Sequence, residues 1–319
     1  MRIAVTRRID EAALDTLRTI GEVEMWDSDL PPSPDQLLQL LDRRDGALTL
    51  LTDRIDGSVL DKLPDLRVVS NLAVGYDNID VPACTERGVA ACTTPDVLTQ
   101  TTAEFALALI FAVARQIVPA ARAAREGEWK SWYPFRFLGR DLAGATLGVV
   151  GLGRIGQRVA TMSAALGMRV VYADEFSTSS EFERVSLTEL LGMADIISLH
   201  VPLTPETRGL TNATTIALMR ADAILINTSR GPVIETDALV SALESGHLSG
   251  VGLDVTDPEP LPNDHPLYTF DRVTIVPHIA SATSVTRHSM SRLAAENVVA
   301  VLTGTDPPHC LNPEVLLRA

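Results

Sequence analysis

The chain has 319 residues, which is enough for two domains with a hydrophobic core each. Its formal net charge of −14 argues against a nucleic-acid partner and against adsorption to an anionic membrane, because both need clustered positive charge. Hydrophobic residues make up 46% of the sequence and aromatic residues only 4%, so the cores must be aliphatic, as in alternating α/β folds.

The first residues, Met1 to Thr6, have the pattern of a short strand and not that of a signal peptide. No apolar run approaches the roughly 18 residues that a membrane span requires. Cys84, Cys92 and Cys310 have no metal-binding spacing, so we expect reduced thiols and no bound metal. These features predict a cytoplasmic protein with no membrane partner.

The first 92 residues alternate short apolar strands with helical patterns, which predicts a small doubly wound domain on a parallel sheet. The expected strands are 2–6, 22–26, 46–51, 67–72 and 89–92, and the expected helices are 10–19, 34–44, 58–63 and 80–87.

A long helix is expected at 98–118, because its apolar stripe is too broad for a simple surface helix. An aromatic and charged stretch follows at 128–137, with two of the three Trp and with neither a helical nor a strand period. We interpret it as an arm that packs on another subunit. The alternative is an internal loop that covers the second domain.

A glycine-rich motif, Gly151-Leu152-Gly153-Arg154-Ile155-Gly156, then follows an apolar strand and opens a helical pattern. The next strand ends at Asp174, 18 residues after Gly156, which is the order of a dinucleotide-binding unit. Gly151 permits a tight turn, Gly153 lets the backbone approach a pyrophosphate, and Gly156 lets the helix pack on the strand. Asp174 would accept hydrogen bonds from a ribose 2′-OH and repel a 2′-phosphate. The next basic residue after it is Arg184, so the sequence favours NAD over NADP.

The strand–helix alternation continues to the end of the second domain, which gives six expected strands, at 146–151, 168–173, 195–200, 222–227, 250–254 and 273–276. A final helix at 285–302 leads back to the first domain. We therefore expect an α/β protein with two doubly wound parallel-sheet domains. A Rossmann NAD-binding domain (98–288) is inserted into a smaller flavodoxin-like substrate domain (1–97 and 289–319), with a cleft between them.

Three polar residues follow late strands, at the edge where an open α/β sheet places its ligand groups. Arg230 can hold a planar carboxylate with two hydrogen bonds. His278 can donate a proton to a carbonyl that receives hydride, and Glu259 would orient its ring and stabilise the imidazolium. Together they indicate reduction of a 2-oxo acid.

The segments 151–156, 227–231, 254–260 and 277–283 resemble the D-isomer-specific 2-hydroxyacid dehydrogenases, and 71–80 is similar to the substrate loop of that family. The resemblance covers almost the whole chain. It implies a catalytic set of Arg230, Glu259 and His278, a small 2-oxo or 2-hydroxy acid substrate, NAD as the cofactor, and a homodimer with the segment after the first interdomain helix at its interface. It also implies cofactor contacts from Gly151, Gly153, Arg154, Ile155, Gly156, Asp174, His200, Val201, Pro202, Thr207, Thr228, Ser229, Arg230, Asp254 and His278.

The backbone amides of Val74 and Gly75 are implied to help Arg230 hold the substrate carboxylate, and we expect Leu51, Val74 and Trp132 in the pocket wall. Within the family, 129–132 and 261–267 look most like glyoxylate/hydroxypyruvate reductases. The leading expectation is NAD(H)-dependent reduction of glyoxylate or hydroxypyruvate to the D-2-hydroxy acid. Several glyoxylate reductases, however, have basic residues where Asp174 stands and use NADPH. The alternatives are a glycerate, 2-ketogluconate or D-lactate type dehydrogenase, or a non-enzymatic NAD-sensing protein on the same scaffold.

Overall fold

The computed structural model describes residues 1–318 and divides the chain into two compact units. The first unit combines Met1–Leu98 with Ala282–Ala319, and the second is Thr99–Ser281. The first boundary lies one residue after the expected one, and the second lies seven residues before it. The second difference arises because helix α11 (Ser284–Thr303) packs against a helix and three strands of the first unit.

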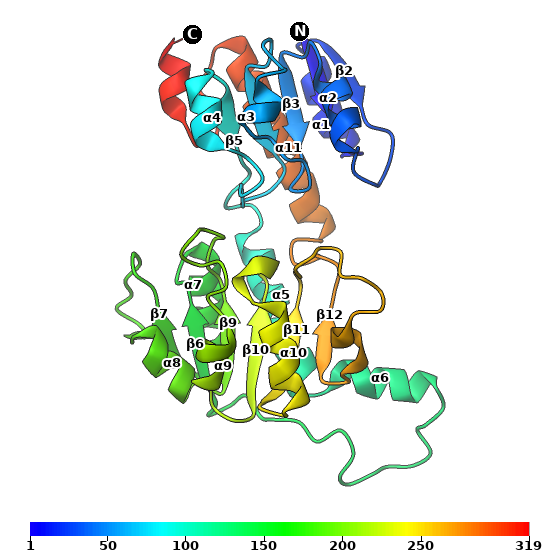
Figure 1. Cartoon of the computed structure of the whole chain (residues 1–319), viewed down its shortest axis with the longest axis vertical. Helices are drawn as coiled ribbons and strands as arrows, with labels where there is room; N and C mark the ends of the chain where they lie inside the picture. Colours follow the sequence, from blue (N-terminus) through cyan, green and yellow to red (C-terminus); the bar gives the residue numbers. More distant parts are fainter. Residues whose placement is uncertain (319) are drawn as a thin grey trace. The chain divides into compact units, whose positions relative to one another are not determined.

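The described residues of the first unit form a five-stranded sheet in which all paired strands are parallel (Figure 1). The strand order β2-β1-β3-β4-β5 is the flavodoxin-like order that was expected. The strands are β1 (Arg2–Val5), β2 (Glu22–Met25), β3 (Gly46–Thr49), β4 (Val68–Asn71) and β5 (Ala90–Cys92).

Both faces of this sheet are buried, because alternate side chains of each strand point to opposite faces. Ala4 of β1 belongs to an apolar cluster with the helices on one face, whereas its neighbours Ile3 and Val5 are equally buried and point to the other face. Helices α1 and α11 pack on each other, and α11 also packs on β3 and β4. The helices before α11 are α1 (Glu11–Arg18), α2 (Pro34–Leu41), α3 (Gly57–Leu60) and α4 (Val81–Glu86).

The second unit holds a seven-stranded sheet over the described residues, again with only parallel pairs. The order is β12-β11-β10-β9-β6-β7-β8, so the chain runs outward from β6 in one direction and from β9 in the other. β6 and β9 thus flank the topological switch point of a Rossmann fold. The strands are β6 (Thr146–Val150), β7 (Arg169–Ala173), β8 (Glu183–Arg184), β9 (Ile196–Leu199), β10 (Ala223–Asn227), β11 (Leu248–Leu253) and β12 (Val273–Ile275).

The expectation of six strands in this sheet was wrong by one. β8 is the additional strand, and it consists of two exposed charged residues paired with Val171 and Tyr172 of β7. It contains no apolar residue and therefore lacks the pattern by which the other strands could be predicted.

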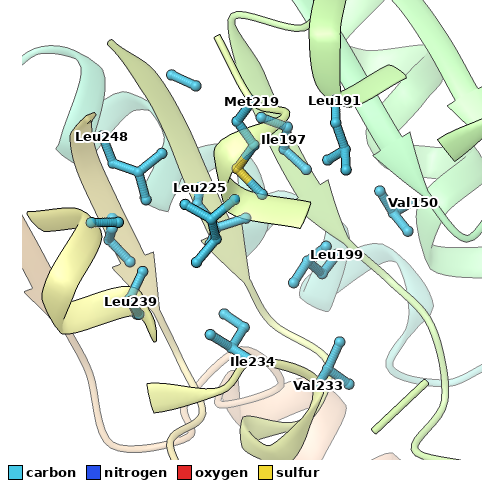
Figure 2. Packing of buried hydrophobic residues seen from close by; sticks show 14 of the residues in the cluster. Val150, Leu191, Ile197, Leu199, Met219, Leu225, Val233, Ile234, Leu239 and Leu248 are labelled. Atoms are coloured by element: carbon cyan, nitrogen blue, oxygen red, sulfur yellow. The ribbon is translucent and has the colours of Figure 1, made fainter. Parts of the chain in front are cut away.

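Helices cover both faces of the second sheet. On one face, Ile197, Leu199 and Leu225 of the strands lie in a buried aliphatic cluster with Leu191 of α8 and Leu239 of α10 (Figure 2). Helices α5 and α7 pack on the opposite face, where they close a second cluster. The helices of this unit are α5 (Thr99–Ala114), α6 (Ile117–Arg125), α7 (Arg154–Ala165), α8 (Leu187–Met193), α9 (Ala213–Ala217) and α10 (Thr236–Glu244).

The single helix expected at 98–118 was wrong, because the chain bends between α5 and α6. Gln116 adopts the left-handed conformation with φ of 50°, and the carbonyl of Ala114 accepts a hydrogen bond from Arg140 N at 2.7 Å. A Cβ on Gly139 would lie 2.3 Å from Ala114 O, so glycine is required where this loop crosses the bend. Within residues 1–318, no single helix is long and apolar enough to cross a membrane; only the pair α5 and α6, bent by 64°, meets that test by length and composition.

Candidate active site

A glycine-rich turn joins β6 to α7. Gly151 has a φ of +91°, which L residues rarely adopt, and a Cβ on Gly156 would lie 2.1 Å from Gly151 O. Gly153 is the N-cap of α7, and a Cβ there would meet no atom within 4 Å. The space beside Gly153 is therefore open, and the first-turn amides of α7, which include Arg154 and Ile155, carry the partial positive charge that favours phosphate. The turn fits a dinucleotide pyrophosphate.

Asp174 follows β7, and its carboxylate holds this turn in place. Oδ2 accepts a hydrogen bond from Leu152 N at 2.6 Å, and Oδ1 accepts from Phe176 N at 2.8 Å and Ser177 N at 2.6 Å. Burial raises the pKa of Asp174, but these backbone hydrogen bonds lower it by more, so the pKa lies below its ordinary value. The ionised carboxylate retains lone pairs that can accept a hydrogen bond from a ribose hydroxyl.

Arg184 lies closer to Asp174 than their separation in the sequence suggests. β8 pairs with β7, and Nη2 of Arg184 donates to the carbonyl oxygens of Asp174 and, at 3.3 Å, Glu175. A guanidinium therefore stands beside the carboxylate that was expected to repel a 2′-phosphate. A ribose bound here would therefore meet both the negative carboxylate of Asp174 and the positive guanidinium of Arg184.

The loop after β9 places His200, Val201, Pro202 and Thr207 at the same edge of the sheet. Nε2 of His200 lies 2.8 Å from Oγ of Ser198, and burial lowers the pKa of His200 to about 4. Its ring is thus neutral at physiological pH and cannot act as a second acid there. Thr207 Oγ1 donates to Pro202 O at 2.6 Å, which folds this loop back on itself.

The loop after β10 contains an unsatisfied polar atom. Oγ1 of Thr228 is buried and has no hydrogen-bond partner among the described residues, whereas Oγ of Ser229 donates to Asn227 Oδ1 at 2.7 Å. A buried hydroxyl without a partner is rare in native proteins unless a ligand or water satisfies it. The unsatisfied hydroxyl therefore supports a ligand at this edge, as the glycine turn does.

Arg230 comes directly after these residues, in a loop that Asn227 fixes. Asn227 Nδ2 donates to Arg230 O at 2.8 Å, and Nη1 of Arg230 donates to Ser229 O at 2.9 Å. A Cβ on Gly231 would lie 1.9 Å from Thr256 O. Only glycine lets this loop pass so close to the segment that follows β11 and leads to Glu259.

His278 is paired with Glu259. Nδ1 of His278 lies 2.6 Å from Oε1 of Glu259, and because a carboxylate can only accept, Nδ1–H is the donor. His278 has a φ of 52°, in the left-handed region, and its backbone N donates to Asp254 O at 2.9 Å. The pairing leaves Nε2 as the ring nitrogen available to a substrate.

Asp254, which follows β11, holds the loop that carries His278. Its carboxylate oxygens accept from Ile279 N at 2.6 Å and Ala280 N at 3.0 Å. Burial raises the pKa of Asp254 by more than these hydrogen bonds and the nearby His278 lower it. Asp254 was expected to contact the cofactor, and the structure adds a positioning role to that expectation.

The remaining predicted substrate residues lie in the first unit. Val74 is exposed, Gly75 and Leu51 are half-buried, and no hydrogen bond described within residues 1–318 involves the amide N–H of Val74 or Gly75. These two N–H groups are therefore suited to bind an anion such as a carboxylate.

Two asparagine side chains that were not predicted from the sequence, Asn71 and Asn78, hold the loop after β3 and the loop after β4 in the first unit. Asn71 Nδ2 donates to Gly75 O at 3.0 Å and to Asn78 Oδ1 at 3.1 Å. Asn78 Nδ2 in turn donates to Leu50 O at 3.1 Å and Asp53 O at 2.8 Å. Both asparagines belong to the segment 71–80 that was expected to bind substrate, and this segment is the signal by which they could have been found.

The structure therefore brings the predicted cofactor and catalytic residues of the second unit to one place, the carboxyl edge of the sheet. The glycine turn follows β6, Arg230 follows β10, Glu259 follows β11 and His278 follows β12. β10, β11 and β12 are adjacent. Leu51, Val74 and Gly75 are on the other unit, and Trp132, also expected in the pocket wall, is 82% exposed on the segment after α6.

Comparison with known proteins agrees with this arrangement. Residues 107–280 match the family model described as D-isomer specific 2-hydroxyacid dehydrogenase, NAD binding domain. A glyoxylate reductase from Aeropyrum pernix is 46% identical to this chain over 99% of it and 97% of the relative. The crystal structure of the TT0316 protein from Thermus thermophilus has 48% identity and a TM-score of 0.94, covering 98% of this chain and all of that one.

A second solved structure is an NADPH-dependent glyoxylate/hydroxypyruvate reductase from Sinorhizobium meliloti, in complex with NADP and malonate. It has 30% identity and a TM-score of 0.87, and covers 97% of this chain and 96% of that one. The family match spans more than half of the chain, and the likeness to relatives spans nearly all of it. The resemblance found in the sequence is confirmed: the chain belongs to the D-isomer-specific 2-hydroxyacid dehydrogenases, oxidoreductases whose NAD-binding domain is here the second unit.

Proposed function

We propose that this enzyme reduces glyoxylate or hydroxypyruvate to the corresponding 2-hydroxy acid. The observation that carries the proposal is the 2.6 Å contact between His278 Nδ1 and Glu259 Oε1. Glu259 follows β11 and His278 follows β12, and β11 lies between β12 and β10, the strand that precedes Arg230. A general acid and a carboxylate-binding cation at one sheet edge are what 2-oxo acid reduction needs. The names of the Aeropyrum and Sinorhizobium relatives favour these two substrates.

The roles of the side chains follow from their chemistry. The Arg230 guanidinium binds the substrate carboxylate with two hydrogen bonds and polarises the neighbouring carbonyl oxygen. The nicotinamide, when bound, supplies the hydride. Nε2–H of His278 protonates the carbonyl oxygen as the carbonyl carbon accepts that hydride, so that C=O becomes CH–OH and the ring is left neutral. Glu259 keeps the ring oriented and stabilises its protonated form before the transfer.

Turnover measurements test these roles. Wild-type enzyme should oxidise NADH in the presence of glyoxylate or hydroxypyruvate, with lower kcat/KM for pyruvate, 2-ketogluconate and bulkier 2-oxo acids. Arg230→Ala and His278→Ala should each lose several orders of magnitude in turnover while they still bind NADH in a fluorescence titration. His288→Ala, which changes a histidine that is 60% exposed, is the matched control and should keep full activity.

Near-normal turnover in either active-site variant would refute the assignment. Binding of NADH without turnover of any 2-oxo acid would instead support the NAD-sensing alternative.

We propose further that NAD is preferred over NADP, because Asp174 is ionised and directly follows β7, where a carboxylate is expected to bind the ribose 2′-OH. Asp174→Ala should lower the ratio of kcat/KM with NADH to that with NADPH at least tenfold, whereas Arg184→Ala should raise it. Glu181→Ala removes an exposed carboxylate from the same loop and should leave the ratio unchanged. An unaltered ratio in Asp174→Ala would refute the argument.

We also propose that the enzyme is a homodimer in which the segment 128–137 packs on the partner. Three aromatic side chains in it are mostly exposed in the single chain: Trp129 by 75%, Trp132 by 82% and Phe135 by 83%. Three large aromatic side chains exposed within one short segment are typical of an interaction site. Joint substitution of the three by serine should give a monomer in light scattering, whereas Phe176→Ser, at an aromatic residue that is 95% exposed elsewhere on the unit, should not. A monomeric wild type, or a dimeric triple variant, would contradict the proposal.

A further inference from the structure

Two cysteines face each other at the edge of the first unit's sheet. Cys92 ends the edge strand β5 and forms an isolated antiparallel bridge with Cys310. The neighbouring backbone hydrogen bond runs from Leu311 N to Ala91 O at 2.8 Å, so the two cysteines occupy a non-hydrogen-bonded pair of the ladder. In such a pair the Cα atoms are about 4.5 Å apart. This separation falls within the roughly 4.4–6.8 Å that disulfides span.

The two thiols differ in exposure and in reactivity. Both are free; Cys92 is fully buried, whereas Cys310 is partly exposed. The Cys310 S–H donates a hydrogen bond to Asn312 Oδ1 at 3.4 Å, and the contact with Cys92 lowers the pKa of Cys310 by more than burial raises it. The same contact, together with burial, raises the pKa of Cys92. Cys310 is therefore the thiol that an oxidant can reach and that forms a thiolate more readily, and Cys92 is its adjacent partner.

We propose that Cys92 and Cys310 are a reversible thiol-oxidation site, at which a hydroperoxide converts the pair into a disulfide. The Cys310 thiolate attacks the peroxide oxygen, the O–O bond breaks, and a sulfenic acid and one molecule of water or alcohol form. Cys92 sulfur then attacks Cys310 Sγ, and the sulfenic oxygen leaves as a second water. Both sulfurs are oxidised, the peroxide is reduced, and a dithiol reductant reverses the change.

The disulfide would fasten the segment after α11 to the sheet. In the reduced protein, Asn312 already holds this segment: its Oδ1 accepts from Ala91 N at 2.8 Å, and its Nδ2 donates to Val89 O at 2.9 Å. The segment thus covers the backbone of an edge strand that would otherwise be open to pairing. Oxidation adds a covalent bond to these contacts, and it changes none of the residues proposed to carry out the reduction.

Thiol counting and peptide mapping on the full chain test the proposal with hydrogen peroxide as the probe. Under denaturing conditions the three thiols should fall to one after mild oxidation and return to three with dithiothreitol. Mass spectrometry should find the peptides of Cys92 and Cys310 joined within one chain. The melting temperature should rise by several degrees on oxidation and fall back on reduction, because the link constrains the unfolded chain.

Variants separate this pair from the third cysteine. Cys84 lies on α4 and is buried in an apolar cluster, and burial raises its pKa to about 12, so Cys84→Ser should oxidise as wild type does. Cys310→Ser should slow oxidation of the remaining thiols at least tenfold and should form no link. Three results would overturn the proposal: a disulfide that includes Cys84, over-oxidation of Cys310 without a disulfide, or an oxidised protein with the same melting temperature as the reduced protein.

Discussion

Substitution of Gly231 by alanine would test how closely the Arg230 loop must approach the segment that leads to Glu259. An added Cβ would lie 1.9 Å from Thr256 O, whereas real Cβ contacts essentially never fall below 3.0 Å. One of the two backbones must therefore move by about 1.1 Å, the difference between these two distances. Displacement of a catalytic group by about 1 Å can cost 10²-fold in rate. We expect kcat for 2-oxo acid reduction to fall about a hundredfold in Gly231→Ala.

The assay is steady-state oxidation of NADH, combined with thermal unfolding and a fluorescence titration of NADH. Cofactor binding should change little, because the glycine turn after β6 is untouched. The matched control is Gly192→Ala in α8, where an added Cβ would meet only Leu218 O at 3.9 Å. It should keep full activity and gain roughly 0.5–1 kcal/mol in stability from helix propensity. A Gly231→Ala enzyme with kcat within threefold of wild type would refute the reasoning.

Three further predictions concern other positions. Glu259→Gln keeps a hydrogen-bond acceptor for the His278 ring but removes the negative charge. A charged acceptor strengthens a hydrogen bond by about 1–1.5 kcal/mol, so kcat should fall about tenfold. The control Glu244→Gln, at an exposed residue, should leave kcat unchanged. Asn78→Ala leaves the carbonyls of Leu50 and Asp53 without this donor. The KM for the 2-oxo acid should rise about tenfold, and the KM for NADH should not change. A change in kcat alone would contradict the positioning role. Burial lowers the pKa of His200 from 6.5 to about 4 in the folded protein. The stability that the neutral ring contributes is therefore complete above pH 6.5 and is lost as the pH falls toward 4. The free energy of unfolding should fall by up to about 3 kcal/mol over this range. Urea unfolding at several pH values should therefore show a flatter acid limb in His200→Gln than in wild type.

Most of the fold could be predicted from the sequence because a parallel sheet buried on both faces needs continuous apolar strands. β10 begins with such a run, at 223–226, and residues that follow the strand must lie at the carboxyl edge. That reasoning led from strand ends to Arg230 and His278 without knowledge of their contacts. The glycine turn could also be predicted, because the spacing of its three glycines reflects the local backbone geometry of the turn.

The parts that could not be predicted depend on contacts between distant residues. The bend at Gln116 exists because a loop more than twenty residues later reaches the carbonyl of Ala114. Arg184 approaches Asp174 only because β8 pairs with β7. Asp254 could be assigned to the edge of the sheet, but its hydrogen bonds to the loop after His278 require the three-dimensional course of both segments.

The discontinuous construction of the first unit has a consequence for the order of folding. Its helix α11 packs on α1, β3 and β4, so its core cannot close until residue Thr303 has been synthesised. The second unit is one uninterrupted stretch, Thr99–Ser281, and all its strands and covering helices leave the ribosome earlier. Because domains fold as units during synthesis, the cofactor domain can be complete while Met1–Leu98 still waits with one face of β3 and β4 uncovered by α11. That waiting face is the surface of the nascent chain that a chaperone would need to shield.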